Sequence, residues 1–167
     1  KMAIYTGLLN KVDPTDDELA QVLAHEISHA LANHTAERMS VAMASQLGVV
    51  GIGIATRNSG YGGAALTGSA LAAALAIQLP NSRSSESEAD IMGMDLAARA
   101  GYDPHAAVTL WQKMNEVGGG RPPQFLSTHP DPENRQARLA ALIPEMMPYY
   151  QAPGERPFHP VTIVDHE

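Results

Sequence analysis

The chain has 167 residues, of which 44% are hydrophobic and 5% aromatic, and its formal net charge is -7. This length favours a single domain over residues 1–167, with a core of Ala, Leu, Ile, Val and Met that leans helical. The acidic balance and the lack of a Lys/Arg cluster argue against a nucleic-acid partner. Because the chain has no cysteine, a metal site would have to use nitrogen and oxygen ligands.

The first third of the chain predicts a strand and then a long helix. Residues 3–9 are rich in strand formers and precede the turn-prone "NKVDP", so we expect a strand there. Thr15 and Glu18 have the spacing of a capping box, which predicts a helix start. Apolar residues then recur at the helical period, so this helix should run toward Gly48. The six glycines of residues 48–63 predict irregular structure.

The rest of the chain predicts four helices that begin or end at prolines, glycines or capping residues. Their expected ranges are 64–79, 85–100, 103–118 and 131–142. The proline-containing segment 144–167 predicts an extended tail with one more strand. Residues 58–82 carry no charge, but small and polar residues dominate them, so we do not expect a membrane span there.

The segment "HEISH" places two histidines, His25 and His29, four residues apart on the first predicted helix. At this spacing both imidazoles can point at one metal ion, while Glu26 is rotated by about 100° around the helix axis. Zinc binds imidazole nitrogen, and a hydrolytic zinc site has three protein ligands and leaves the fourth position to water. The motif therefore favours a metal site with a general base over two solvated histidines.

Without cysteine, the third ligand must be a carboxylate or another histidine. The segment "SSESEAD" offers Glu86, Glu88 and Asp90 at an expected helix start. Glu86 and Asp90 share a helix face, and Glu88 points away from both. One of the first two could bind the metal, while the other accepts the free N–H of a ligating histidine and fixes its tautomer. Acidic residues in a first helical turn also stabilise a helix without any metal.

Four ordered segments carry a resemblance to a known family: "HEISHALANH", "SRSSESEAD", "RAGYDP" and "STHPDPENR". They look like the HtpX and CAAX-prenyl-protease type of zinc metallopeptidase (metallopeptidase family 48, gluzincin clan), over residues 5–142. The resemblance is closest to the bacterial envelope branch, whose members are often outer-membrane lipoproteins or periplasmic proteins of protein quality control. It implies a mostly helical α+β, gluzincin-like fold with a long active-site helix and a small edge sheet.

The resemblance also assigns roles to seven residues of this chain. These are the ligands of one zinc ion, His25, His29 and Glu86, the general base Glu26, the second-shell carboxylate Asp90, and the pocket residues His129 and Arg135. His129 or Arg135 is expected to donate to the oxyanion, a role typically worth about 3 kcal/mol. His129 has a second expected role, because a fourth imidazole on the zinc would displace the catalytic water and silence the enzyme.

The expected function is zinc-dependent endopeptidase cleavage of unfolded or misfolded polypeptides in the bacterial envelope, with Glu26 deprotonating a zinc-activated water. Substrate chains would pair with the edge strand at residues 3–9. We expect the chain to be a piece of a longer protein, whose N-terminal part would provide any membrane association. Residues 48–79 would form a lid or a membrane-apposed helix. Two alternatives stay open, a binding or assembly factor with a blocked zinc site and a CAAX-type processing peptidase.

Overall fold

The computed structural model describes residues 4, 6–55, 64–118 and 134–152, with residues 64–81 described by their backbone. Its elements are η1 (Leu8–Val12), α1 (Asp16–Leu31), α2 (His34–Ala55), α3 (Ala64–Arg99), α4 (Ala106–Gly118) and α6 (Arg135–Tyr150). The expectation of a mostly helical fold is confirmed. The small edge sheet is not seen, since the described residues contain no strand.

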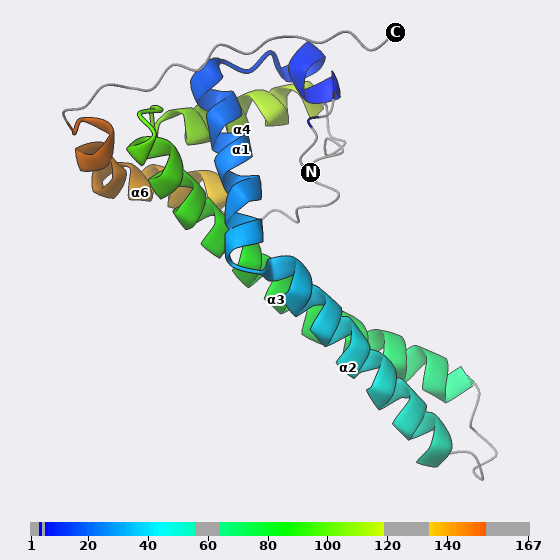
Figure 1. Cartoon of the computed structure of the whole chain (residues 1–167). Helices are drawn as coiled ribbons and strands as arrows, with labels where there is room; N and C mark the ends of the chain where they lie inside the picture. Colours follow the sequence, from blue (N-terminus) through cyan, green and yellow to red (C-terminus); the bar gives the residue numbers. More distant parts are fainter. Residues whose placement is uncertain (1–3, 5, 56–63, 119–133, 153–167) are drawn as a thin grey trace, which may run out of the picture.

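The helices form a compact body and a protruding hairpin (Figure 1). In the body, α1 packs along the second half of α3, and α4 and α6 pack against these two helices. The hairpin consists of α2 and the first half of α3, which lie side by side and extend away from the body. The two segments that pack together in the body, α1 and the second half of α3, are therefore separated in the sequence by the whole hairpin.

The core of the body lies where α1, α3, α4 and α6 meet. Its buried side chains are Val12, Val22, Met94, Ala98, Ala107, Leu110, Trp111, Met114, Leu139 and Met146. Trp111 is the one aromatic residue among them, and the others are Val, Met, Ala and Leu, as the composition indicates. Trp111 lies beside the histidine motif, so the core and the candidate site share a wall.

The capping box at the start of α1 is confirmed. The Thr15 hydroxyl accepts a hydrogen bond from the Glu18 backbone N–H (3.2 Å), and the Glu18 carboxylate accepts one from the Thr15 backbone N–H (2.8 Å). Glu18 also accepts bonds from Thr109 and Lys113, both at 2.7 Å, which tie α1 to α4. Burial raises the pKa of Glu18, but these hydrogen bonds outweigh it and bring the pKa below its ordinary value.

The strand expected at residues 3–9 is wrong where the structure describes it. Thr6 and Gly7 are helical and lead into η1. Leu8 and Val12, four residues apart, face the core together, whereas Leu9 is 42% exposed. These two residues lie about one helical turn apart, so η1 packs one face on the core. The expected pairing of a substrate chain with an edge strand therefore loses its basis.

The helix that starts at Thr15 does not run unbroken toward Gly48. It ends at Leu31, and the backbone φ of +57° at Asn33 turns the chain before α2 begins at His34. Asparagine is one of the few residues other than glycine that enter this left-handed conformation at little cost. The irregular region expected from Gly48 is also wrong over residues 48–55, which continue α2; residues 56–63 lie outside the described residues.

The two helices expected at 64–79 and 85–100 are one continuous helix, α3. Neither Pro80 nor the capping pair at Ser85 interrupts it. A proline inside a helix removes one hydrogen bond and costs about 3 kcal/mol, but α3 packs along α2 and α1 on both sides of this point. The expected end is confirmed, because α3 stops at Arg99 and Gly101 adopts φ +86°.

The helix expected at 103–118 is present as α4, which starts at Ala106, three residues later than expected, and ends at Gly118 as expected. The helix expected at 131–142 is longer at its C-terminal end: α6 runs to Tyr150 through Pro144 and Pro148. Its apolar residues keep the helical period beyond the first proline and pack on the core. The extended tail is therefore wrong over residues 144–150, and residues 153–167 lie outside the described part.

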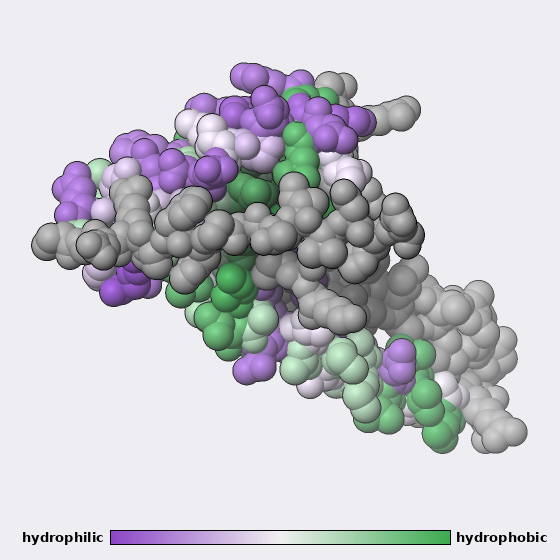
Figure 2. All heavy atoms as spheres, turned by 45° about the horizontal axis from the view of Figure 1, so that its top comes forward, coloured by the Kyte–Doolittle hydropathy of each residue, from purple (hydrophilic) through white to green (hydrophobic). Residues whose placement is uncertain are grey.

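The surface of α2 carries a run of exposed large apolar residues. They are Met39, Met43, Leu47, Val50, Ile52 and Ile54. Figure 2 shows the hydrophobic atoms of this face gathered along the hairpin, while polar atoms dominate the body. No helix within the described residues is long and apolar enough to cross a membrane.

The crossing of α1 and α3 depends on Gly93. A Cβ atom at this position would lie 3.0 Å from the His25 backbone nitrogen and 3.1 Å from its Cα. Gly93→Ala is expected to destabilise the protein and to weaken metal binding, because overpacking costs about 1–3 kcal/mol while the gain in helix propensity is about 1 kcal/mol. Urea denaturation and zinc titration measure the two effects.

Gly48→Ala is the matched control for this prediction. Gly48 also lies inside a helix, but a Cβ atom there meets nothing within 4 Å. This variant is expected to gain stability by the helix-propensity term of about 1 kcal/mol. If Gly93→Ala were stabilised to the same degree, the close contact between the two helices would not limit their packing.

Candidate metal centre

The structure brings His25, His29 and Glu86 together at the α1–α3 crossing. All three side chains are buried, and each offers a ligand atom to one point between them. The two Nε2 atoms are 3.1 Å apart. The Glu86 carboxylate lies 3.2 Å from His25 Nε2 through one oxygen and 3.4 Å from His29 Nε2 through the other. The expected third ligand, Glu86, therefore approaches both histidines from another helix, α3.

These separations match what zinc requires of its ligands. Zinc–nitrogen and zinc–oxygen bonds of about 2.0–2.1 Å in a tetrahedron place neighbouring ligand atoms about 3.3 Å apart. The three observed separations, 3.1, 3.2 and 3.4 Å, are each close to this value, and each histidine Nε2 atom faces a different oxygen of Glu86. A fourth position on the open side would remain for water. Two nitrogens and one carboxylate are also a typical donor set for catalytic zinc.

Asp90 lies where a carboxylate can fix the tautomer of His25. Its Oδ1 atom is 3.1 Å from His25 Nδ1, so the Nδ1–H donates to Asp90 and the Nε2 lone pair faces the metal point. Burial lowers the pKa of His25, but hydrogen bonds to Asp90 and Glu86 outweigh it and raise the pKa above its ordinary value. The two carboxylates therefore stabilise the positive charge of a protonated His25.

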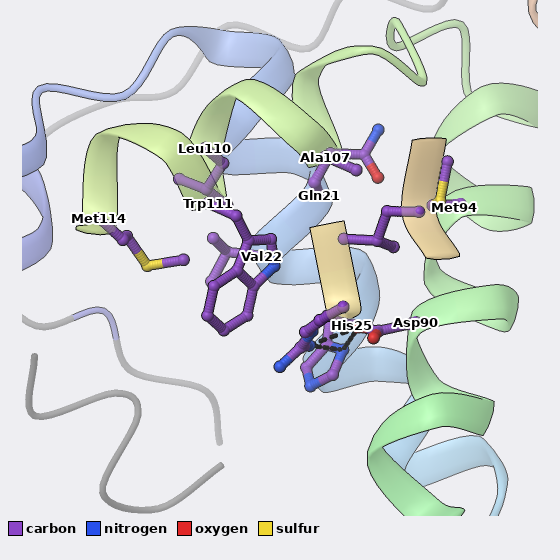
Figure 3. Close-up of a pocket in the computed structure, with 11 residues that line it drawn as sticks. Gln21, Val22, His25, Asp90, Met94, Ala107, Leu110, Trp111 and Met114 are labelled. Carbon is purple, nitrogen blue, oxygen red and sulfur yellow. Dashed lines mark hydrogen bonds and ion pairs between the residues drawn. The ribbon is translucent and has the colours of Figure 1, made fainter. Parts of the chain in front are cut away.

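Arg135, at the start of α6, is buried against the same carboxylates. Its Nη2 group donates to Asp90, and Nη1 lies 3.9 Å from Glu86. The guanidinium stacks 4.0 Å from the centre of the Trp111 ring. Figure 3 shows His25 and Asp90 at one end of a small cavity of about 30 Å³, with Trp111 on its wall. Arg135 thus links the candidate metal ligands to the core.

Two of the residues with expected roles are placed less fully. Glu26 follows His25 on α1 and its side chain is half-buried, which agrees with a base at the rim of the site. His129 lies outside the described residues. Glu88, which was expected to point away from Glu86 and Asp90, contacts His34.

The sequence analysis missed two residues of this cluster, His34 and Arg38. His34 is buried, and its Nδ1 atom lies 2.8 Å from His29 Nδ1. Arg38 Nη2 lies 3.5 Å from Glu86 Oε1. On an unbroken helix, a residue five positions after His29 would point to another face. The turn at Asn33 brings His34 back, and an asparagine just before it was the signal that could have indicated this turn.

Comparison with known proteins identifies the family of this chain. The sequence model for peptidase family M48 matches residues 1–143. The chain is 40% identical over 157 residues to the metalloendopeptidase OMA1, mitochondrial, of Bos taurus, covering 86% of this chain and 29% of that protein. It is 37% identical over 140 residues to the mitochondrial metalloendopeptidase OMA1 of Arabidopsis thaliana, covering 84% and 27%.

A bacterial relative is similar to a comparable degree. The chain is 35% identical over 156 residues to the beta-barrel assembly-enhancing protease of Escherichia coli (strain K12), covering 88% of this chain and 31% of that protein. No solved structure matches. The chain spans about a third or less of these three relatives, and the mitochondrial and bacterial proteins do not single out one branch. With a family match over most of its length, the chain belongs to peptidase family M48.

Proposed function

We propose that this chain is the catalytic domain of a zinc-dependent metalloendopeptidase. The observation that carries the proposal is the buried cluster of His25, His29 and Glu86, whose ligand atoms lie within 4.8 Å of one another, with separations of 3.1, 3.2 and 3.4 Å between histidine nitrogens and carboxylate oxygens or the other nitrogen. Membership of peptidase family M48 supports the same reaction class. A bound zinc ion would supply an acidified water and polarise the scissile carbonyl.

The remaining steps belong to side chains of the chain itself. Glu26, at the rim beside His25, takes a proton from the attacking water and delivers it to the leaving amine. Asp90 keeps the His25 ring in the binding orientation. The Nη2 group of Arg135 donates a hydrogen bond to Asp90, while its Nη1 group makes no hydrogen bond within the described part of the chain. Arg135 Nη1 and His129 are the proposed donors to the oxyanion.

We further propose that the substrates are unfolded or misfolded proteins of the bacterial envelope. The support is similarity to relatives named beta-barrel assembly-enhancing protease. The similarity to mitochondrial OMA1 proteins provides an alternative setting for the same chemistry. Faster cleavage of a reduced, unfolded protein than of its native form is the expected behaviour, and equal rates would contradict this substrate class.

Removal of the metal provides the direct test of the zinc site. The purified protein loaded with zinc is expected to hydrolyse casein, and treatment with 1,10-phenanthroline is expected to stop hydrolysis, because the His-His-Glu cluster holds the metal required for the chemistry. Added zinc should restore the rate. Release of acid-soluble peptides measures activity, and metal analysis measures occupancy. Undiminished hydrolysis by metal-free protein would contradict the proposal.

A further inference from the structure

His34 is a buried histidine beside a candidate metal ligand. It begins α2, its exposure is 2%, and its Nδ1 atom lies 2.8 Å from Nδ1 of His29. On its other side, Nε2 lies 3.4 Å from a Glu88 carboxylate oxygen. The three side chains therefore form a row that starts at the metal point and ends at the surface, where the Glu88 side chain is 59% exposed.

A hydrogen bond between two imidazole nitrogens needs one proton. Whether that proton is bonded to His29 or to His34 determines whether His29 can bind a metal ion. If His29 Nδ1–H donates to His34, the His29 Nε2 atom keeps a lone pair that faces Glu86 and His25. If His34 Nδ1–H donates instead, neutral His29 carries its proton on Nε2 and presents N–H to the metal point. Only the first arrangement makes His29 a metal ligand.

Glu88 favours the first arrangement. When His34 accepts at Nδ1, its own proton sits on Nε2 and points at the Glu88 carboxylate. When His34 donates at Nδ1, the neutral ring turns a lone pair toward that carboxylate, and the two acceptors repel each other. The orientation of His34 between the two groups thus selects the metal-binding tautomer of His29, just as Asp90 does for His25.

We propose that His34 is a positioning residue that holds His29 in the tautomer and orientation required to bind the metal. The inference rests on the zinc site proposed above and adds a residue to it. It also gives the break at Asn33 a role, because this turn places His34 behind His29. The metal site is therefore supported by three helices, with α1 and α3 supplying ligands and α2 supplying the support.

Three substitutions separate the two contacts of His34. The amide of Asn reaches the position of Nδ1, whereas the amide of Gln reaches the position of Nε2, and Ala provides neither group. Loss of such a support typically weakens metal binding 10–100-fold. We expect His34→Ala and His34→Gln to lose zinc affinity by about this factor, and His34→Asn to stay close to wild type. Competition with a chromophoric zinc chelator measures the affinity.

His105→Ala is the matched control, since His105 is an exposed histidine that also pairs with a carboxylate, Asp103, away from the site. Its zinc affinity should equal that of wild type. Circular dichroism of the metal-free proteins checks whether they fold. If His34→Ala fails to fold, the comparison of zinc affinity between His34→Asn and His34→Gln tests the proposal. Wild-type affinity in the Ala or Gln variant, or a loss in Asn as large as in Gln, would overturn the role of His34. Failure of wild type to bind zinc would instead overturn the proposed site.

Discussion

Glu26→Gln is expected to lower the rate of peptide hydrolysis by about 10²- to 10⁴-fold, the usual contribution of a general base. Gln has the shape of Glu but cannot accept a proton at neutral pH. Zinc affinity should change little, because Glu26 is not one of the three residues whose ligand atoms converge. Casein hydrolysis at saturating zinc, together with bound zinc measured in both proteins, tests the two expectations.

Glu116→Gln on α4 is the control for a general effect of losing a carboxylate. Glu116 is exposed and makes no part of the cluster, so hydrolysis should continue at the wild-type rate. A Glu26→Gln protein that binds zinc and cleaves normally would refute the assignment of the base. If wild type binds zinc and cleaves nothing, the site is blocked or the function is binding, and His129→Ala becomes the next variant to measure.

Local patterns were enough to predict that His25 and His29 share one face of α1. The capping pair Thr15 and Glu18 defines where the helix begins, and a four-residue spacing within one helix places His25 and His29 on one face. The geometry of such pairs depends on nothing outside the helix. Glu86 and Asp90 were predicted as a pair for the same reason, but their approach to the histidines depends on the close contact at Gly93.

The helices that continue through prolines were missed because they depend on contacts between distant segments. Pro80 and Pro144 are strong local stop signals, yet both lie inside helices. In α6, Leu139 and Met146 keep a seven-residue spacing across Pro144 and remain buried, so packing on the core outweighs the lost hydrogen bond. His34 was missed because one left-handed residue, Asn33, changes the face on which it lies.

The same reasoning applies to the first residues of the chain. Strand-forming composition predicted a strand at residues 3–9, but composition does not say which residues are buried. The four-residue separation of Leu8 and Val12 fits a helical turn against α4, and both contact the core. A count of apolar residues at each period over residues 4–12 would have given the better prediction, because the pairs at 4–5 and 8–9 and Val12 recur at the helical spacing and do not alternate strictly.

Arg135→Met is expected to have the largest effect on stability, a loss of about 3–5 kcal/mol in the free energy of unfolding. Replacing both members of a buried ion pair can be harmless, but this change removes one member and leaves Asp90 and Glu86 buried. It also removes the stacking on Trp111. The loss should be greater in metal-free protein, where no cation offsets the two carboxylates. Urea denaturation with and without zinc measures it.

Arg99→Met provides a control with the same contacts at the surface. Arg99 pairs with Asp95 at 2.8 Å and stacks 3.9 Å from the centre of the Tyr149 ring, but its side chain is 53% exposed. Water solvates Asp95 when this arginine is removed, so stability should hardly change. A similar small effect for Arg135→Met would mean that His25 alone compensates Asp90. Arg135 would then not be needed to stabilise the buried Asp90. A lower kcat of this variant would in that case indicate that Arg135 acts on the substrate.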